Sequence, residues 1–288
     1  MGVPAAEVTL EEKQLRRLIE AQAPAYAHLA LSLESSGWDN FMYRLGPEHV
    51  VRLPRRQAAA VLAEHEQRWL PTFAARLPLK IPAPIHRGVP GEGYPWAWSI
   101  CPWIDGSSAD ASPPEAGEWA SLVRFLKALH RPAPATAPKN PYRGVPLIER
   151  RAKFEEAAGR LQAAGSLTHR HREVFAQGLA APMDAPMTWI HGDLHPCNLL
   201  TRNGKLAGVI DWGDVAQGDP ATDLAGLFLL SADEDLLKHA LADYQASKAT
   251  ADRARAWAVL FAAIFADAGL RGDARMGPIG LRFLDALK

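Results

Sequence analysis

The sequence has few cysteines, no net charge and no long hydrophobic run. Its two cysteines among 288 residues, Cys101 and Cys197, lie far apart, which excludes a disulfide framework and a cysteine-rich metal site. Its 32 Lys and Arg balance 32 Asp and Glu, so the chain lacks the basic excess that nucleic-acid binding requires. The longest apolar run, residues 256–266, is too short to span a bilayer. We therefore predict a protein that binds neither nucleic acid nor a membrane.

The N-terminal region also lacks the pattern of a secretory signal, because Glu11, Glu12 and Lys13 interrupt it early. A cytoplasmic location is therefore expected. What the chain does have is the composition of a folded protein, with 48% hydrophobic and 22% charged residues. At roughly 100–200 residues per domain, its length fits two domains or one large bilobal domain.

The secondary-structure signals differ between the two parts of the chain. The first part favours strands, and its predicted elements are a helix at 7–22, strands at 41–45, 50–53 and 96–104, and a helix at 57–73. The second part favours helices, predicted at 115–130, 147–164, 168–180, 231–247 and 252–270. Segment 131–146 carries five prolines, which exclude regular structure. We predict an α+β fold with a β-rich N-terminal lobe, residues 1–104, and a larger helical C-terminal lobe, residues 105–288.

A hairpin is predicted in the second lobe, where Asn203-Gly204 separates two β-favouring runs. This dipeptide is typical of a two-residue type I′ turn, which pairs Arg202 with Lys205. Counting outwards from that pair places Asn198 opposite Val209.

In this register Asp211 lies two residues beyond Val209 on the same face, as a diagonal neighbour of Asn198. An amide oxygen and a carboxylate so placed can converge on one hard cation. Asp193 lies in the loop that leads into the hairpin. Its spacing to Asn198 matches the D-x-x-x-x-N catalytic loop of kinases, and Asp211-Trp212-Gly213 matches their D-F-G motif. Each residue alone is also typical of turns and caps, but turn chemistry does not explain the whole string.

Three motifs carry a resemblance to a known family: HGDLHPCN at 191–198, IDWGD at 210–214 and GDPATDL at 218–224. Together they resemble the aminoglycoside phosphotransferase family, which has a protein-kinase-like fold. The resemblance implies a small-molecule kinase that uses Mg²⁺ to transfer the γ-phosphoryl group of ATP or GTP to a hydroxyl. The acceptor would be an aminoglycoside, a macrolide or another small metabolite, and the role antibiotic resistance or metabolism.

The resemblance also assigns roles to residues of the second lobe. Asp193 resembles the catalytic base, and Asn198 and Asp211 resemble the Mg²⁺ ligands. His195 and Asp214 are candidates for binding the acceptor. Among the other polar residues of these motifs, His191 is expected to brace the loop, and Asp219 and Asp223 to be structural.

The first lobe is predicted to bind the nucleotide. Residues 35–40 resemble the loop that covers the phosphates, with Ser36, Gly37 and Asn40 as candidate contacts, although such clusters are also ordinary turns. Arg52 stands where kinases have the phosphate-binding Lys. Its expected partner is Glu66, with Glu64 as the competitor.

Residues 98–104 resemble the hinge that receives the nucleotide base. Pro102 has no N–H to donate, so Trp103 and Ile104 are the candidate backbone contacts. A core strand is the alternative, and both interpretations are compatible.

Two other functions stay open. Arg52 in place of Lys raises the alternative of a nucleotide-binding pseudokinase that acts as a sensor or scaffold. A metal-dependent hydrolase built on His191, Asp193 and His195 would leave the hairpin and the first lobe unexplained. For the kinase, the expected partners are the nucleotide and a small acceptor, and the expected state is a monomer or weak dimer.

Overall fold

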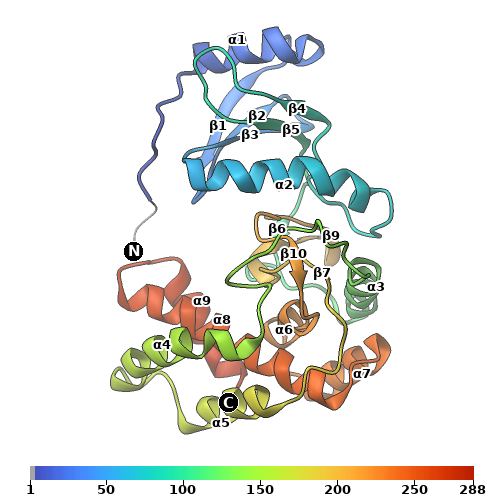
Figure 1. Ribbon diagram of the computed structural model, residues 1–288, viewed down its shortest axis with the longest axis vertical. Helices are drawn as coiled ribbons and strands as arrows, with labels where there is room; N and C mark the ends of the chain where they lie inside the picture. The colour runs from blue at the N-terminus through green and yellow to red at the C-terminus, as the bar shows by residue number, and fades with distance from the viewer. Residues whose placement is uncertain (1–3) are drawn as a thin grey trace. The chain divides into compact units, whose positions relative to one another are not determined.

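A computed structural model describes residues 4–288, apart from the side chain of Ser36, and these residues form two compact units that divide after Asp105. The first unit contains an antiparallel five-stranded sheet with the order β1-β2-β3-β5-β4. The strands are β1 (Leu31–Ser36), β2 (Asn40–Leu45), β3 (His49–Pro54), β4 (His86–Gly88) and β5 (Trp98–Pro102). Helices α1 (Glu12–Gln22) and α2 (Gln57–Ala74) cover opposite faces of this sheet (Figure 1), and a short 3-10 turn, η1 (Pro24–Tyr26), follows α1.

The core of the first unit lies between α1 and the sheet. Leu15, Leu18 and Ile19 recur every three or four residues, so they share one face of α1, and all three are buried. They belong to the same apolar cluster as Val51 of β3 and Trp98 of β5. This packing fixes the strands from which the candidate nucleotide-binding residues extend.

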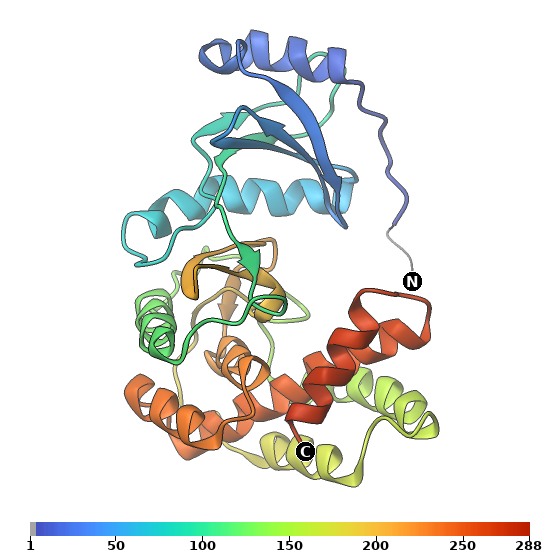
Figure 2. The same cartoon turned by 180° about the vertical axis from the view of Figure 1, so that it is seen from behind.

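The second unit is mostly helical. Its helices are α3 (Trp119–Leu129), α4 (Arg151–Ala163), α5 (His169–Ala180), α6 (Ala221–Leu230), α7 (Glu234–Tyr244), α8 (Lys248–Leu270) and α9 (Met276–Ala286). Short 3-10 turns are η2 (Ala116–Glu118), η3 (Leu147–Arg150) and η4 (Pro196–Asn198). Helix α8 is the centre of this unit, because α4, α5, α6 and α9 all pack against it (Figure 2). Trp257 and Phe261 on α8 are fully buried core residues.

Two small sheets complete the second unit. One pairs β6 (Ser107–Ser108), β8 (Leu199–Arg202) and β9 (Lys205–Val209), and the other pairs β7 (Thr188–Ile190) with β10 (Ala216–Gly218). The prediction of a β-rich part followed by a larger helical part is confirmed. Residues 131–146, as described, contain no helix or strand beyond a single bridge from Pro132 to Thr188, in agreement with their proline content. No helix within residues 4–288 has both the length and the apolar character to cross a membrane.

The predicted hairpin is present, but its predicted register is wrong beyond the turn. Asn203 and Gly204 have φ of 51° and 73°, as a type I′ turn requires, and Arg202 pairs with Lys205. Between the pairs Thr201–Leu206 and Leu200–Gly208, β9 carries one extra residue. This β-bulge shifts the register by one.

The bulge changes the position of Asn198. Val209 faces Leu199 instead of Asn198, and the amide of Ile210 donates to the Asn198 carbonyl at 2.9 Å. Asn198 is therefore aligned with the residue directly before Asp211. The dipeptide at the turn could be recognised from the sequence, whereas the bulge has a weaker signal, the glycine at position 208, which the predicted register did not use.

Candidate active site

Asp193 lies in a loop between β7 and η4. The loop turns at Gly192, whose φ of 87° belongs to the left-handed region that favours glycine. A Cβ atom at this position would lie 2.5 Å from the carbonyl oxygen of Asp214. The close approach therefore requires glycine, and it brings the backbone of Asp214 beside the loop that carries Asp193.

The side chain of Asp223 on α6 fixes this loop through hydrogen bonds to its backbone. Its carboxylate accepts hydrogen bonds from the amides of His191 at 2.7 Å and Gly192 at 2.9 Å, and it contacts His130 Nε2 at 3.1 Å. Asp223 is fully buried, so these bonds form away from competing water. The side chain thus fixes the backbone on which Asp193 depends. By contrast, Asp219 accepts from the amide of Ala221 at the start of α6.

His191 braces the loop from within. Its Nε2 contacts the carbonyl oxygen of Ile210 at 2.9 Å, and its Nδ1 accepts from the amide of Asp193 at 3.2 Å. The ring packs against Trp212 with the centroids 4.7 Å apart. Because both ring nitrogens are occupied by backbone groups, His191 has a structural role, as the sequence predicted.

The carboxylate of Asp193 is held from two sides. Arg143 Nη2 donates to Oδ1 at 2.8 Å, and His195 Nε2 contacts Oδ2 at 3.2 Å. Asn198 Nδ2 donates to the backbone carbonyl of Asp193 at 2.9 Å. The structure therefore brings Asp193, His195 and Asn198 together and adds Arg143, which the sequence did not indicate.

These contacts set the charge of the cluster. Burial raises the pKa of Asp193, but the positive charges of Arg143 and His195 outweigh it and hold that pKa below its ordinary value. Burial lowers the pKa of His195, whereas the neighbouring Asp193 carboxylate raises it, with a net value of about 9. At neutral pH the pair is therefore a carboxylate and an imidazolium.

His195 was predicted to bind the acceptor. Its side chain is only 3% exposed, and its ring packs edge-on against Phe265 with the centroids 4.9 Å apart. This burial favours a role in holding Asp193 over direct contact with a substrate.

Asp214, the other acceptor candidate, accepts a hydrogen bond from Asn140 Nδ2 at 2.5 Å. Burial and the negative charge of Asp193 raise the pKa of Asp214. The two carboxylates therefore influence each other, and Asp214 belongs to the same cluster.

The candidate metal ligands, Asn198 and Asp211, carry oxygen donors of the kind that Mg²⁺ prefers. Asn198 turns its amide nitrogen to Asp193, so its amide oxygen points away from that carboxylate. Asp211 is exposed and follows Ile210, whose amide binds the Asn198 backbone. Residues 4–288 contain no group of three or more His, Cys, Asp or Glu suited to a metal. Mg²⁺ does not need one, because it takes one or two protein oxygens and completes its shell with phosphates and water.

In the first unit, the candidate phosphate loop is a tight turn between β1 and β2. The amide of Gly37 donates to the carbonyl of Asn40 at 3.0 Å. Two arginines after β3 hold this turn: Arg55 Nη1 donates to the Gly37 carbonyl at 2.5 Å, and Arg56 pairs with Asp39 at 2.6 Å. Ser36 ends β1, but its side chain lies outside the described part of the chain. The sequence did not single out either arginine.

Arg52 and Glu66 form the expected pair. Arg52 Nη2 lies 3.0 Å from Glu66 Oε1, Nη1 lies 2.9 Å from Oε2, and both side chains are buried. The competitor, Glu64, is exposed. The Nη2–Oε1 contact is a hydrogen bond and the Nη1–Oε2 contact is an ion pair, and together they connect β3 with α2.

The hinge candidates lie at the end of β5. The amide of Trp103 donates to the carbonyl of Glu48 at 2.7 Å, and its ring lies 3.9 Å from the guanidinium of Arg44. The Trp103 N–H is therefore occupied, which leaves its carbonyl and the backbone of Ile104 as the candidate base contacts.

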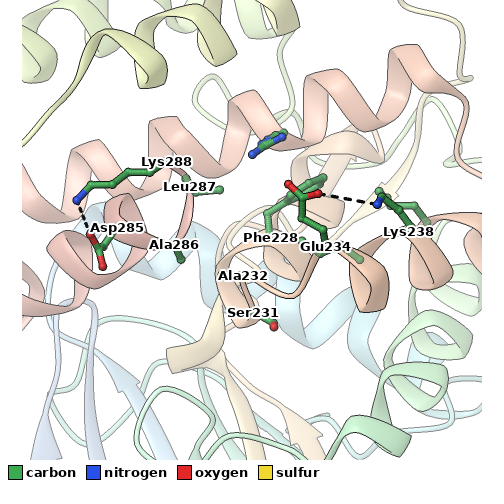
Figure 3. Close-up of a pocket in the computed structure, with 12 residues that line it drawn as sticks. Phe228, Ser231, Ala232, Glu234, Lys238, Asp285, Ala286, Leu287 and Lys288 are labelled. Carbon is green, nitrogen blue, oxygen red and sulfur yellow. Dashed lines mark hydrogen bonds and ion pairs between the residues drawn. The ribbon is translucent and has the colours of Figure 1, made fainter.

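A separate cavity of about 350 Å³ lies among α6, α7 and α9 (Figure 3). Its wall includes an ion pair between Lys238 and Glu234. None of the 12 described residues that line it is a candidate site residue.

The comparisons with known proteins identify the family and the fold. Residues 31–258 match the model of a phosphotransferase enzyme family, APH. The fold is similar to the GDP complex of aminoglycoside 2'-phosphotransferase-IIIa, with 20% identity, a TM-score of 0.69 and coverage of 96% of this chain and 98% of that one.

Two further solved structures have the same fold. ADP-bound APH(2'')-Ib has 21% identity, covers 96% and 98% of the two chains and gives a TM-score of 0.62. Macrolide 2'-phosphotransferase type I has 21% identity, covers 98% and 99% and gives a TM-score of 0.62. A comparison with curated protein sequences finds no match. The kinase-like fold and the predicted enzyme class, a phosphotransferase, are confirmed. The family model matches residues 31–258, which is most of this chain. The chain therefore belongs to the phosphotransferase enzyme family.

Proposed function

We propose that the protein transfers the γ-phosphoryl group of ATP or GTP to a hydroxyl of a small molecule. The Asp193 cluster carries this proposal, because it combines a carboxylate held in its ionised form with an Asn five residues later, whose carbonyl binds the residue before Asp211. Phosphoryl transfer depends mainly on positioning and on neutralising charge, and this cluster is suited to both.

In this proposal Asp193 orients the acceptor hydroxyl and accepts its proton. Its two oxygens are fixed by Arg143 and His195, and an ionised carboxylate keeps further lone pairs that can accept the hydroxyl proton. The amide oxygen of Asn198 and the carboxylate of Asp211 would hold Mg²⁺. When bound, Mg²⁺ would neutralise charge on the transferring phosphoryl group.

The first unit supplies the nucleotide-binding groups. A buried Arg52–Glu66 pair corresponds to the Lys–Glu pair that active kinases require, which supports a catalytic protein over a pseudokinase. The backbone of residues 37–40 is proposed to cover the phosphates, and the segment after β5, at Ile104, to contact the base.

The nearest leads for the acceptor come from the structural neighbours. Their complexes contain GDP or ADP, and two of them contain kanamycin or gentamicin. Both donors and both acceptor classes, aminoglycosides and macrolides, therefore belong in the first assay. We propose that the acceptor is an alcohol of one of these classes or of a comparable small metabolite.

The test is a transfer assay with ATP or GTP, Mg²⁺ and kanamycin, gentamicin, erythromycin or small amino alcohols and sugars. Nucleoside diphosphate release and an 80 Da gain in acceptor mass, the mass of one added HPO₃ group, are measured. We expect Asp193→Asn to reduce turnover by about 100-fold or more while nucleotide affinity, measured by calorimetry, stays within about twofold.

Asp243→Asn is the matched control. Asp243 is exposed on α7. The Asp243→Asn variant should therefore transfer the phosphoryl group at the rate of the unaltered protein. Retained turnover in Asp193→Asn would contradict the assignment, as would the absence of phosphorylated product across the whole panel.

A further inference from the structure

We propose that Asn140 and Arg143, on the proline-rich segment between α3 and η3, are positioning residues that hold Asp214 and Asp193 for phosphoryl transfer. The inference rests on the proposed function, because it assumes that Asp193 receives the acceptor proton. Neither residue belongs to a motif that the sequence revealed, and both reach the cluster from a segment distant in sequence.

The segment is attached to the body of the second unit at several points. The amide of Gln217 on β10 donates to the carbonyl of Pro138 at 3.1 Å, and Thr222 Oγ1 on α6 donates to the carbonyl of Arg143 at 3.4 Å. A Cβ atom at Gly144 would lie 2.6 Å from the carbonyl oxygen of Gln217, so the chain passes β10 too closely for a side chain. The prolines reduce the conformational entropy of this segment in the unfolded chain, which lowers the cost of ordering it in the fold.

Asn140 uses both ends of its amide. Its Oδ1 accepts from the amides of Tyr142 at 2.8 Å and Arg143 at 3.0 Å, which shapes the turn that presents Arg143. Its Nδ2 donates to Asp214 Oδ1 at 2.5 Å. One side chain therefore sets the conformation of the segment and fixes a carboxylate of the cluster.

The guanidinium of Arg143 makes two contacts. It lies over the ring of Phe261 on α8, 4.5 Å from the centroid, and donates to Asp193 Oδ1 at 2.8 Å. The exposed fractions of the Arg143 and Asp193 side chains are 14% and 20%, so water screens this pair only in part. Arg143 and His195 bind different oxygens of Asp193 and thereby fix the orientation of the carboxylate.

This orientation matters because a displacement of about 1 Å at a reacting group can reduce the rate by about 100-fold. A planar guanidinium stacked on an aromatic ring holds a carboxylate more precisely than a flexible ammonium does. Arg143 should therefore act on kcat through Asp193 and leave nucleotide binding unaffected.

The experiment compares three variants of the full chain, using the acceptor that gives the highest turnover. Arg143→Met removes the guanidinium but keeps an apolar stem against Phe261, Arg143→Lys keeps the charge, and Lys139→Met removes an exposed cation from the same segment. We expect kcat to fall about 10–100-fold in Arg143→Met and to recover in part in Arg143→Lys. Nucleotide Kd and the Tm should change little in either variant, and Lys139→Met should match the unaltered protein.

Two results would overturn the inference. One is an unchanged kcat in Arg143→Met. The other is a fall in kcat accompanied by equal losses of nucleotide affinity and Tm in both Arg143 variants, which would indicate a merely structural role. If Asp193→Asn is inactive while Arg143→Met is fully active, only this inference fails. If Asp193→Asn is fully active, the proposed function fails first.

Discussion

At the scale of single residues, the buried charges of Arg52 and Glu66 form an ion pair. Arg52 and Glu66 are 9% and 6% exposed at their side chains and make two contacts. Such a pair contributes little net stability compared with apolar residues, but removing one partner leaves a buried charge without compensation. The departure from the usual Lys at this position is therefore accommodated by a geometry specific to Arg.

We predict that Arg52→Met lowers the free energy of unfolding by about 3–5 kcal/mol, because Glu66 then stays buried without its cation. The double variant Arg52→Met/Glu66→Leu should recover most of this loss. Urea denaturation of both single variants and the double variant measures the coupling. Strictly additive losses would contradict the prediction.

At the scale of elements, the second unit depends on close contact between α8 and α9. A Cβ atom at Gly280 of α9 would lie 2.1 Å from the amide nitrogen of Ala266 on α8. No rotamer change relieves a contact with backbone, so the helices must separate if this glycine is replaced. The glycine therefore determines how near α9 lies to the central helix.

Gly280→Ala is expected to destabilise the protein by about 1–3 kcal/mol, since the added methyl group overpacks this contact. Gly159→Ala on α4 is the matched control. A Cβ atom there meets nothing within 4 Å, and alanine favours helix by about 0.5–1 kcal/mol. We expect the Tm to fall in Gly280→Ala and to rise in Gly159→Ala. A Tm decrease in both variants would argue against the packing explanation.

At the scale of the molecule, one polar network connects distant parts of the second unit. Arg253 on α8 is 2% exposed at its side chain and binds Asp219 at 2.7 Å and Asp184 at 3.1 Å. Asp184 precedes β7, and it also accepts from Ser247 and from Thr250, the latter at 3.0 Å. The network thus joins the segment before β7 to the start of α6 and to α8.

This network predicts a pH dependence of stability. The hydrogen bond from Ser247, followed by those from Thr250 and Arg253, lowers the pKa of Asp184 to about 2 from 3.8. A depressed folded-state pKa stabilises the fold above the unfolded pKa, and this contribution is lost as pH falls from about 4 to about 2.

Comparing Asp184→Asn with the unaltered protein tests this dependence. The difference in their free energies of unfolding should be largest above pH ~5 and should shrink below pH ~4. A difference that is constant from pH 7 to pH 3 would show that ionisation of Asp184 does not contribute.

Features set by interactions between residues close in sequence could be predicted, whereas features set by contacts between distant segments could not. Asn203-Gly204 predicts its turn because both residues tolerate positive φ, a local property. The expected partner of Arg52, Glu66, lies on the buried face of α2 with Ala63 and Leu70 at helical spacing, whereas Glu64 is exposed. The bulge in β9 was not predicted, since it arises from the pairing of two strands and its one local signal is Gly208, next to Ala207.

The sequence by itself determined the division into a strand-rich and a helical part, the family and the spacing of Asp193, Asn198 and Asp211, because each is encoded in neighbouring residues. Only the tertiary structure decided what surrounds Asp193. Arg143 is 50 residues away along the chain, and the docking of its segment on β10 and α6 brings it to the carboxylate. Side chains so distant in sequence meet through packing, and local patterns in the sequence do not record that packing.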